Sequence, residues 1–173
     1  MEVFEVIKGR TSVRTFTNKQ VSEEDVNKIL DAAMWAPSAG NIQPWEFIVV
    51  RNIDTKRKLS EAAIHQIFIE TAVVVIVVCA DVSRSGKRYG DRGVNLYSVQ
   101  DTAAATQNML LAAYALKLGT CWVGAFQEES VSEALNLPRE VRPIAIIPVG
   151  YPAEKLEIRT RRSLNEVVHH EKF

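Results

Sequence analysis

The sequence contains few of the residues that build metal centres and disulfide frameworks. Its 173 residues include only two cysteines, Cys79 and Cys121, and three histidines, His65, His169 and His170. The cysteines lie far apart in apolar surroundings and form no CxxC pair, so we expect buried free thiols in a reducing compartment. Two of the histidines fall in the polar C-terminal tail, which argues against a metal site built from them.

Neither an excess of one charge nor a long apolar run is present. Lys and Arg total 21, as do Asp and Glu, and a chain without a basic excess is not expected to bind nucleic acid non-specifically. The longest apolar run, 72–80, is far shorter than the ~20 residues that cross a bilayer. The N-terminal segment MEVFEVIKGR lacks the features of a signal peptide. We therefore expect a cytoplasmic protein without nucleic-acid or membrane partners.

The sequence motifs of several large enzyme classes are also absent. GxGxxG, GxxxxGK[ST], HExxH and GxSxG do not occur, so dinucleotide-binding, P-loop, zincin and α/β-hydrolase folds lack their signatures here. A chain with so little acid–base machinery, if it is an enzyme, is expected to leave the demanding chemistry to a bound cofactor.

The pattern of apolar residues instead predicts one α+β domain over 1–173, with helices packed on both faces of one sheet. Ser22 is expected to cap a helix, with Asp25 three residues on, and Pro37 ends that pattern. Further helices are expected at 3–8, at 99–118, at 130–135 and from Asp54 to about 69. Strands are expected at 47–50, 120–123, 144–149 and 72–80, the last buried on both faces because it shows no polar alternation.

Two basic clusters have the spacing of an anion site. Side chains alternate along an extended segment, so Arg10, Ser12 and Arg14 are expected to project from one side of 10–14. Arg159 and Arg161 repeat this spacing near the C-terminal end. Guanidinium groups bind phosphate through paired hydrogen bonds. From charge alone, two solvated basic patches remain the alternative.

Two other segments offer a surface for a planar ligand. Segment 36–45 holds two prolines, a glycine and the polar side chains Ser38, Asn41 and Gln43; its other interpretation is a helix-to-strand connector with Trp45 as a core anchor. Segment 121–126 is a strand that opens at Gly124, where a ligand can approach the backbone closely. A plain strand end is the alternative there.

Taken together, these segments resemble the small single-domain members of the nitroreductase family, which are FMN-dependent homodimers. The resemblance follows nearly the whole chain in order: Arg10-x-Ser12-x-Arg14-x-Phe16, Ala36-Pro37-Ser38 to Pro44-Trp45, the strand ending at Asp81, Gln100-Asp101, 118–124, 148–152 and Arg159-x-Arg161. Each motif alone is weak, but their joint order and spacing are specific. The resemblance implies a dimeric α+β fold with a central, mostly antiparallel sheet.

The resemblance also implies a set of cofactor-binding residues. Arg10, Ser12, Arg159 and Arg161 would hold the FMN phosphate beside Thr11, and Arg14 would lie near the pyrimidine end of the ring. Pro37, Ser38, Ala39 and Asn41 of the partner subunit would complete the site, Gly124 and Ala125 would present a backbone amide to flavin N5, and Gln66 would touch the flavin. Larger relatives have an Asn and a Lys where this chain has His65 and Phe68, and Lys117 replaces a glycine common in the family. No side chain is assigned a catalytic role.

The implied reaction is a ping-pong transfer, in which NADH or NADPH reduces flavin N5 and an oxidised acceptor, such as a nitroaromatic or a quinone, then takes the electrons. Flavin-destructase and reductive-dehalogenase enzymes on the same fold, and a non-catalytic FMN-binding module, remain alternatives. The segment 84–92 carries four basic residues and two glycines. It is expected to be a mobile loop that either contacts the 2′-phosphate of NADPH or is simply solvated.

Overall fold

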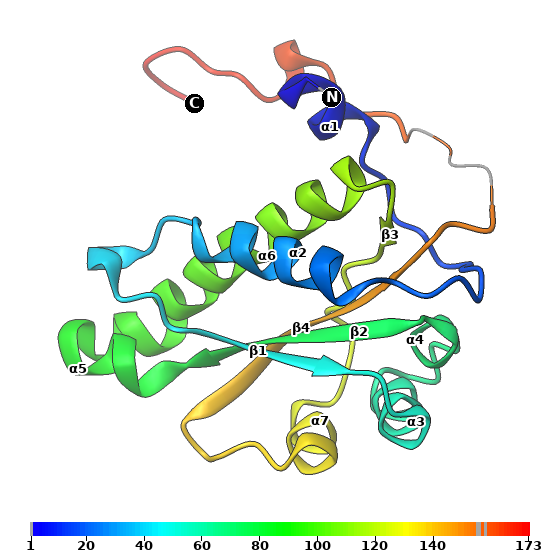
Figure 1. The fold of residues 1–173 in the computed structure, drawn as a ribbon. Coiled ribbons are helices and arrows are strands. Elements are labelled where there is room, and N and C mark those ends of the chain that lie inside the picture. Colours follow the sequence, from blue (N-terminus) through cyan, green and yellow to red (C-terminus); the bar gives the residue numbers. More distant parts are fainter. Residues whose placement is uncertain (1, 155–156, 158) are drawn as a thin grey trace.

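A four-stranded antiparallel sheet forms the centre of the protein, and helices cover both of its faces (Figure 1). The computed structural model describes residues 2–154, 157 and 159–173. The strands are β1 (Trp45–Val50), β2 (Val74–Asp81), β3 (Gly119–Thr120) and β4 (Val141–Gly150), in the spatial order β1-β2-β4-β3. The predicted α+β class and the mostly antiparallel sheet are confirmed.

The central strand β2 separates two hydrophobic cores. Val74, Ile76 and Val78 face one core, and the alternate residues Val75 and Val77 face the other. All of these side chains are fully buried, because β1 and β4 pair with β2 on its two edges while helices cover both faces. The prediction of a strand buried on both faces is therefore correct.

The helices divide between the two faces of the sheet (Figure 1). On one face lie α2 (Glu23–Met34) and α6 (Ser98–Ala115), and on the other α3 (Ile53–Ala62), α4 (Phe68–Thr71) and α7 (Glu128–Leu135). The remaining elements are α1 (Val3–Gly9), α5 (Val82–Arg92), the π-helix η2 (Gly93–Tyr97) and the short 3-10 helices η1 (Ala39–Asn41) and η3 (Leu164–Glu166). Ser22 caps α2 as predicted, its Oγ accepting from the Asp25 N–H at 3.0 Å. No helix among the described residues is long and apolar enough to span a membrane.

The prediction of a single helix from Asp54 to about residue 69 is wrong in both the capping residue and the length of the helix. Asn52, not Asp54, caps α3 by accepting from the Thr55 N–H at 3.0 Å. The helix ends at Ala62, because Ile64 and His65 have positive φ angles of 59° and 54°. Neither position carries the glycine that usually marks a left-handed residue, so no glycine signal predicts this turn.

The prediction of a mobile loop at 84–92 is also wrong, because these residues belong to the helix α5. Asp81 caps it, with Oδ1 accepting from the Ser83 N–H at 3.0 Å. A side chain added at Gly86 would lie 2.9 Å from Val94, so this glycine permits close packing against η2. The strand expected at 120–123 is likewise shorter: only Gly119–Thr120 pair regularly, while Val123 forms an isolated bridge to Ile146.

Candidate functional site

One cavity of about 300 Å³ brings together residues from both ends of the chain. Its lining consists of Arg10, Thr11, Ser12, Arg14, Arg159 and Arg161. Four guanidinium groups and two hydroxyls thus surround one space, and none of the described residues that line it is acidic. The convergence of the two basic clusters agrees with the spacing in the sequence, and this donor set has the chemistry to bind a phosphate-like anion.

Pairing with the sheet edge holds the segment between α1 and α2 extended. The Val13 N–H donates to the Thr120 carbonyl oxygen at 2.9 Å, and Ser12 and Thr120 form a parallel bridge. Val13 is buried under this edge, while Ser12 and Arg14 are exposed. A side chain at Gly119 would lie 2.7 Å from Val13, so that position must be small for the segment to pack. The alternation predicted for 10–14 is therefore present.

The far side of the same segment is held by residues that follow β4. Ala153 N–H donates to the Thr15 carbonyl oxygen at 2.9 Å. Glu154 Oε1 accepts from the Arg14 and Thr15 N–H groups at 3.1 and 3.2 Å. Glu154 was not among the predicted site residues, and it fixes the backbone from which the Arg14 side chain projects.

The positive charge of the cavity acts on two neighbouring side chains, Phe68 and Cys121. The Arg14 guanidinium carbon lies 5.7 Å from the centre of the Phe68 ring, within the range of a cation–π contact. Burial raises the pKa of the Cys121 thiol, while Arg14, a hydrogen bond with Ser12 and Arg10 act in the opposite direction. Cys121 thus lies beside the cavity as a buried free thiol, and the predicted burial is confirmed.

A second set of predicted residues meets near the turn between α3 and α4. Gln66 Nε2 donates to the carbonyl oxygens of Ala63 at 2.9 Å and Ala125 at 3.3 Å. Gly124 and Ala125 are exposed, and the structure gives their amides no hydrogen-bond acceptor among the described residues. These two N–H groups are available to a ligand.

The loop with Pro37, Ser38, Ala39 and Asn41 does not reach the cavity within one chain. Ala39 N–H donates at 3.0 Å to Asp101 Oδ1 in the first turn of α6. Thr120, next to the cavity, follows the other end of this 18-residue helix, which is about 27 Å long at 1.5 Å per residue. Figure 1 shows the loop and the β3 edge on opposite sides of the molecule. Burial raises the pKa of Asp101, and the Ala39 N–H lowers it to a smaller extent.

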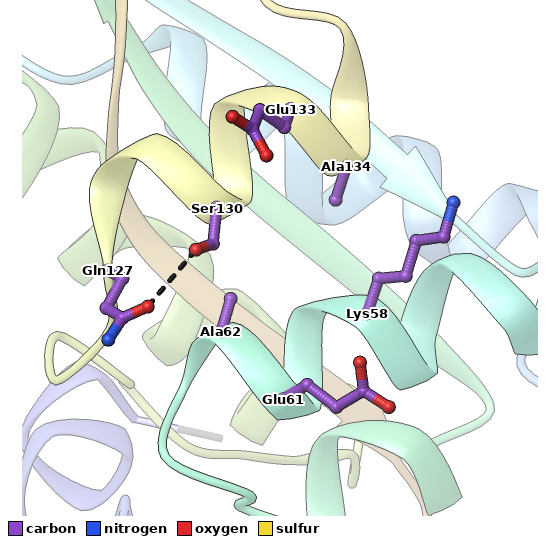
Figure 2. Close-up of a pocket in the computed structure, with 7 residues that line it drawn as sticks. All are labelled: Lys58, Glu61, Ala62, Gln127, Ser130, Glu133 and Ala134. Carbon is purple, nitrogen blue, oxygen red and sulfur yellow. Dashed lines mark hydrogen bonds between the residues drawn. The ribbon is translucent and has the colours of Figure 1, made fainter.

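Another cavity, of about 380 Å³, lies between α3 and α7 (Figure 2). Figure 2 shows Lys58 and Glu61 on α3, and on the other side of the cavity Ser130 Oγ of α7 donates to Gln127 Oε1 at 3.2 Å. One lysine and two acidic residues, Glu61 and Glu133, line this space. It therefore lacks the concentrated positive charge of the cavity around Arg10.

Comparison with known proteins decides the family. The sequence model of the nitroreductase family matches residues 7–73 and 62–151. The chain belongs to the nitroreductase family. A relative from Archaeoglobus fulgidus, named "Putative NADH dehydrogenase/NAD(P)H nitroreductase", is 40% identical over 158 residues, which cover 89% of this chain and 87% of the relative. FMN reductase (NADPH) from Bacillus subtilis is 30% identical over 180 residues, covering 96% of this chain and 72% of the relative.

Solved nitroreductase structures share this fold. A protein of the same name as the Archaeoglobus relative, from Parabacteroides distasonis, has a TM-score of 0.89 at 31% identity, covering 99% of this chain and 98% of that one. NADPH:FMN oxidoreductase from Vibrio harveyi, solved in complex with NAD+, has a TM-score of 0.91 at 26% identity, covering 99% of this nitroreductase and 77% of that chain. The family inferred from the ordered motifs is thereby confirmed.

Proposed function

We propose that this nitroreductase is an FMN-dependent NAD(P)H oxidoreductase that reduces a small oxidised acceptor, such as a nitroaromatic or a quinone, in a ping-pong sequence. Its class as an NAD(P)H-dependent flavin oxidoreductase rests on the family and on relatives named as FMN reductase and NADPH:FMN oxidoreductase. We also propose that residues 1–173 form one FMN-binding domain and that the protein acts in the cytoplasm.

The arginine-lined cavity is the observation that carries this proposal. The phosphate of FMN is a dianion with several acceptor oxygens, and it matches a space lined by Arg10, Ser12, Arg159 and Arg161. Hydrogen bonds between charged partners are roughly twice as strong as those between neutral groups. The residues present therefore fit the phosphate end of FMN.

The rest of the site supplies donors for a flavin ring. When bound, FMN supplies the ring atom N5 through which electrons pass from NAD(P)H to the acceptor. Arg14 contributes a cation whose backbone is fixed by Glu154. The Gly124 and Ala125 N–H groups would donate to the bound cofactor, and Gln66 donates to the Ala125 carbonyl oxygen on the far side of the same residue. The protein thus binds and orients the cofactor and leaves the redox chemistry to it.

We propose further that two chains share their sites in a symmetric homodimer. An apolar groove of about 440 Å³ runs along α1, α2 and α6, and Trp35 beside it is 81% exposed. Exposed apolar surface of this kind marks an interface between proteins. The distance between the loop around Ala39 and the cavity in one chain also supports a site completed by the partner subunit. Sedimentation should show a dimer, and a fully active monomer would contradict the shared sites.

A turnover assay tests the activity. The FMN-loaded protein is mixed with NADH or NADPH, with and without menadione or a nitroaromatic, and nucleotide oxidation is followed. Steady oxidation that depends on the acceptor is expected. A protein that binds FMN but oxidises neither nucleotide would be a non-catalytic flavin-binding module.

A further inference from the structure

The loop that follows α2 has an unusual backbone. Gly40, Asn41 and Gln43 have φ angles of 56°, 55° and 54°, so three of four consecutive residues are left-handed. Residues with side chains rarely adopt this conformation, and it persists only where the surroundings hold it in place. Within the loop, Ser38 Oγ accepts from the Gln43 N–H at 3.0 Å, and Gln43 Nε2 donates to Asn41 Oδ1 at 3.0 Å.

Three charged side chains from α5 and α6 bind the backbone of this loop. Asp101 Oδ1 accepts from the Ala39 N–H at 3.0 Å. Arg88 Nη1 donates to the Gly40 carbonyl oxygen, and Arg84 Nη2 to that of Ile42, each at 3.2 Å. Arg84 and Arg88 belong to the segment 84–92, considered above as a contact for NADPH. In the structure these two guanidinium groups are engaged with the loop.

Asp101 is the buried member of this group. It is only 6% exposed, and its Oδ2 is buried without a hydrogen-bond partner among the described residues. The buried hydroxyls of Thr102 and Thr106 on α6 bond to their own helix: Thr106 Oγ1, for example, donates to the Thr102 carbonyl oxygen at 2.8 Å. Asp101 instead bonds to a separate segment, and a buried carboxylate is costly unless such a bond offsets its loss of water.

We propose that Asp101 is a positioning residue for the cofactor site, acting through the Ala39 amide, with Arg88 fixing the Gly40–Asn41 peptide through the Gly40 carbonyl oxygen. The inference rests on the proposed function, in which Ser38, Ala39 and Asn41 complete the FMN site of the partner subunit. Loss of the Asp101 acceptor releases Ala39 and lets the strained loop relax. The cofactor site of the partner subunit then loses the donors that the loop presents.

The test compares Asp101→Asn with Asp101→Ala. Asparagine keeps a side-chain oxygen that accepts from the Ala39 N–H, whereas alanine has none. FMN dissociation constants are measured by quenching of flavin fluorescence, and circular dichroism and thermal unfolding establish that each variant is folded. We expect Asp101→Ala to weaken FMN binding about tenfold or more and Asp101→Asn to stay within about threefold of the parent, because a tenfold change corresponds to the loss of about one hydrogen bond.

Two controls separate positioning from a general structural role. Thr106→Val removes a buried hydroxyl from the same helix without touching the loop, so it should lower the melting temperature and leave FMN affinity unchanged. Lys87→Ala removes the same charge as Arg88→Ala from the same helix, and only Arg88→Ala should weaken FMN binding, by a few fold.

The outcomes distinguish this inference from the proposed function. If the parent binds FMN and Asp101→Ala binds it equally well, the positioning role is refuted and the proposed function stands. Equal weakening by Asp101→Asn, Asp101→Ala and Thr106→Val would also refute it, since the acceptor would then be irrelevant. If the parent itself fails to bind FMN, the proposed function fails and the positioning role fails with it.

Discussion

Replacing Arg10 with Ala removes one of the four guanidinium groups around the phosphate-sized cavity. A hydrogen bond to a charged partner contributes about 1.5–3 kcal/mol. Since about 1.4 kcal/mol corresponds to a factor of ten, the FMN dissociation constant should rise about 10- to 150-fold. The remaining Arg159 and Arg161 should keep some affinity, so the variant is expected to purify largely colourless and to regain colour in excess FMN.

Riboflavin supplies the matched ligand, because it has the same ring and lacks the phosphate. Fluorescence titration should show that it binds the parent more weakly than FMN does. The parent and Arg10→Ala should bind it with nearly equal affinity. Arg139→Ala serves as the charge control, since Arg139 is exposed and does not line the cavity. Higher salt should reduce the FMN affinity of the parent more than that of Arg10→Ala.

Two results would show that Arg10 does not bind the phosphate of FMN. Unchanged FMN affinity in both Arg10→Ala and Arg161→Ala would make these arginines ordinary solvated side chains. Equal losses for FMN and riboflavin would mean that Arg10 supports the fold or the ring rather than the phosphate.

Three further predictions concern the charge near the ring, a helix end and an ion pair. Arg14→Ala should lower the reduction potential of bound FMN by tens of millivolts, because the Arg14 cation stabilises the reduced flavin and a loss of about 1.4 kcal/mol of this stabilisation corresponds to ~30 mV for two electrons. Spectroelectrochemistry that finds no shift would contradict this. Lys117, two residues after the end of α6, has a φ of 63°, so Lys117→Gly should raise the free energy of unfolding in urea by about 0.5–1 kcal/mol, and a decrease would refute it. Arg142 donates two 2.8 Å hydrogen bonds to Glu128 and lowers its pKa below the ordinary 4.5. The pair therefore stabilises the fold above that pH, and this contribution is lost as the pH falls through the lowered value. Arg142→Ala should cost at most about 1 kcal/mol at neutral pH and much less in acid, since the pair is partly exposed; a cost independent of pH would contradict the ion pair.

Much of the fold could be predicted because the relevant signals are local. The unbroken apolar run of β2 indicates burial on both faces, and Ser22 with Asp25 marks the start of α2. The break after α3 could not be predicted in the same way. Its left-handed residues, Ile64 and His65, are of types that give no turn signal, and their conformation is set by tertiary packing.

The candidate site was predictable in part for a similar reason. Alternation along 10–14 places Arg10 and Arg14 on one side from sequence alone. The bonds of Glu154 and Asp101 to backbone amides are not predictable, because carboxylates that make no such bond have the same local sequence pattern and only the fold shows which amide each one meets. Asp101 lies within the Gln100-Asp101 pair that contributes to the family resemblance, but that pair does not indicate its bond to Ala39.

We propose that this nitroreductase uses FMN to accept electrons from NAD(P)H. The most direct measurement is an anaerobic titration of the FMN-loaded protein with NADH and with NADPH, following the visible absorption of the flavin. The visible band should bleach in proportion to the nucleotide added and return when menadione is supplied. A protein that holds no FMN, or whose flavin band stays unchanged with both nucleotides, would contradict the claim.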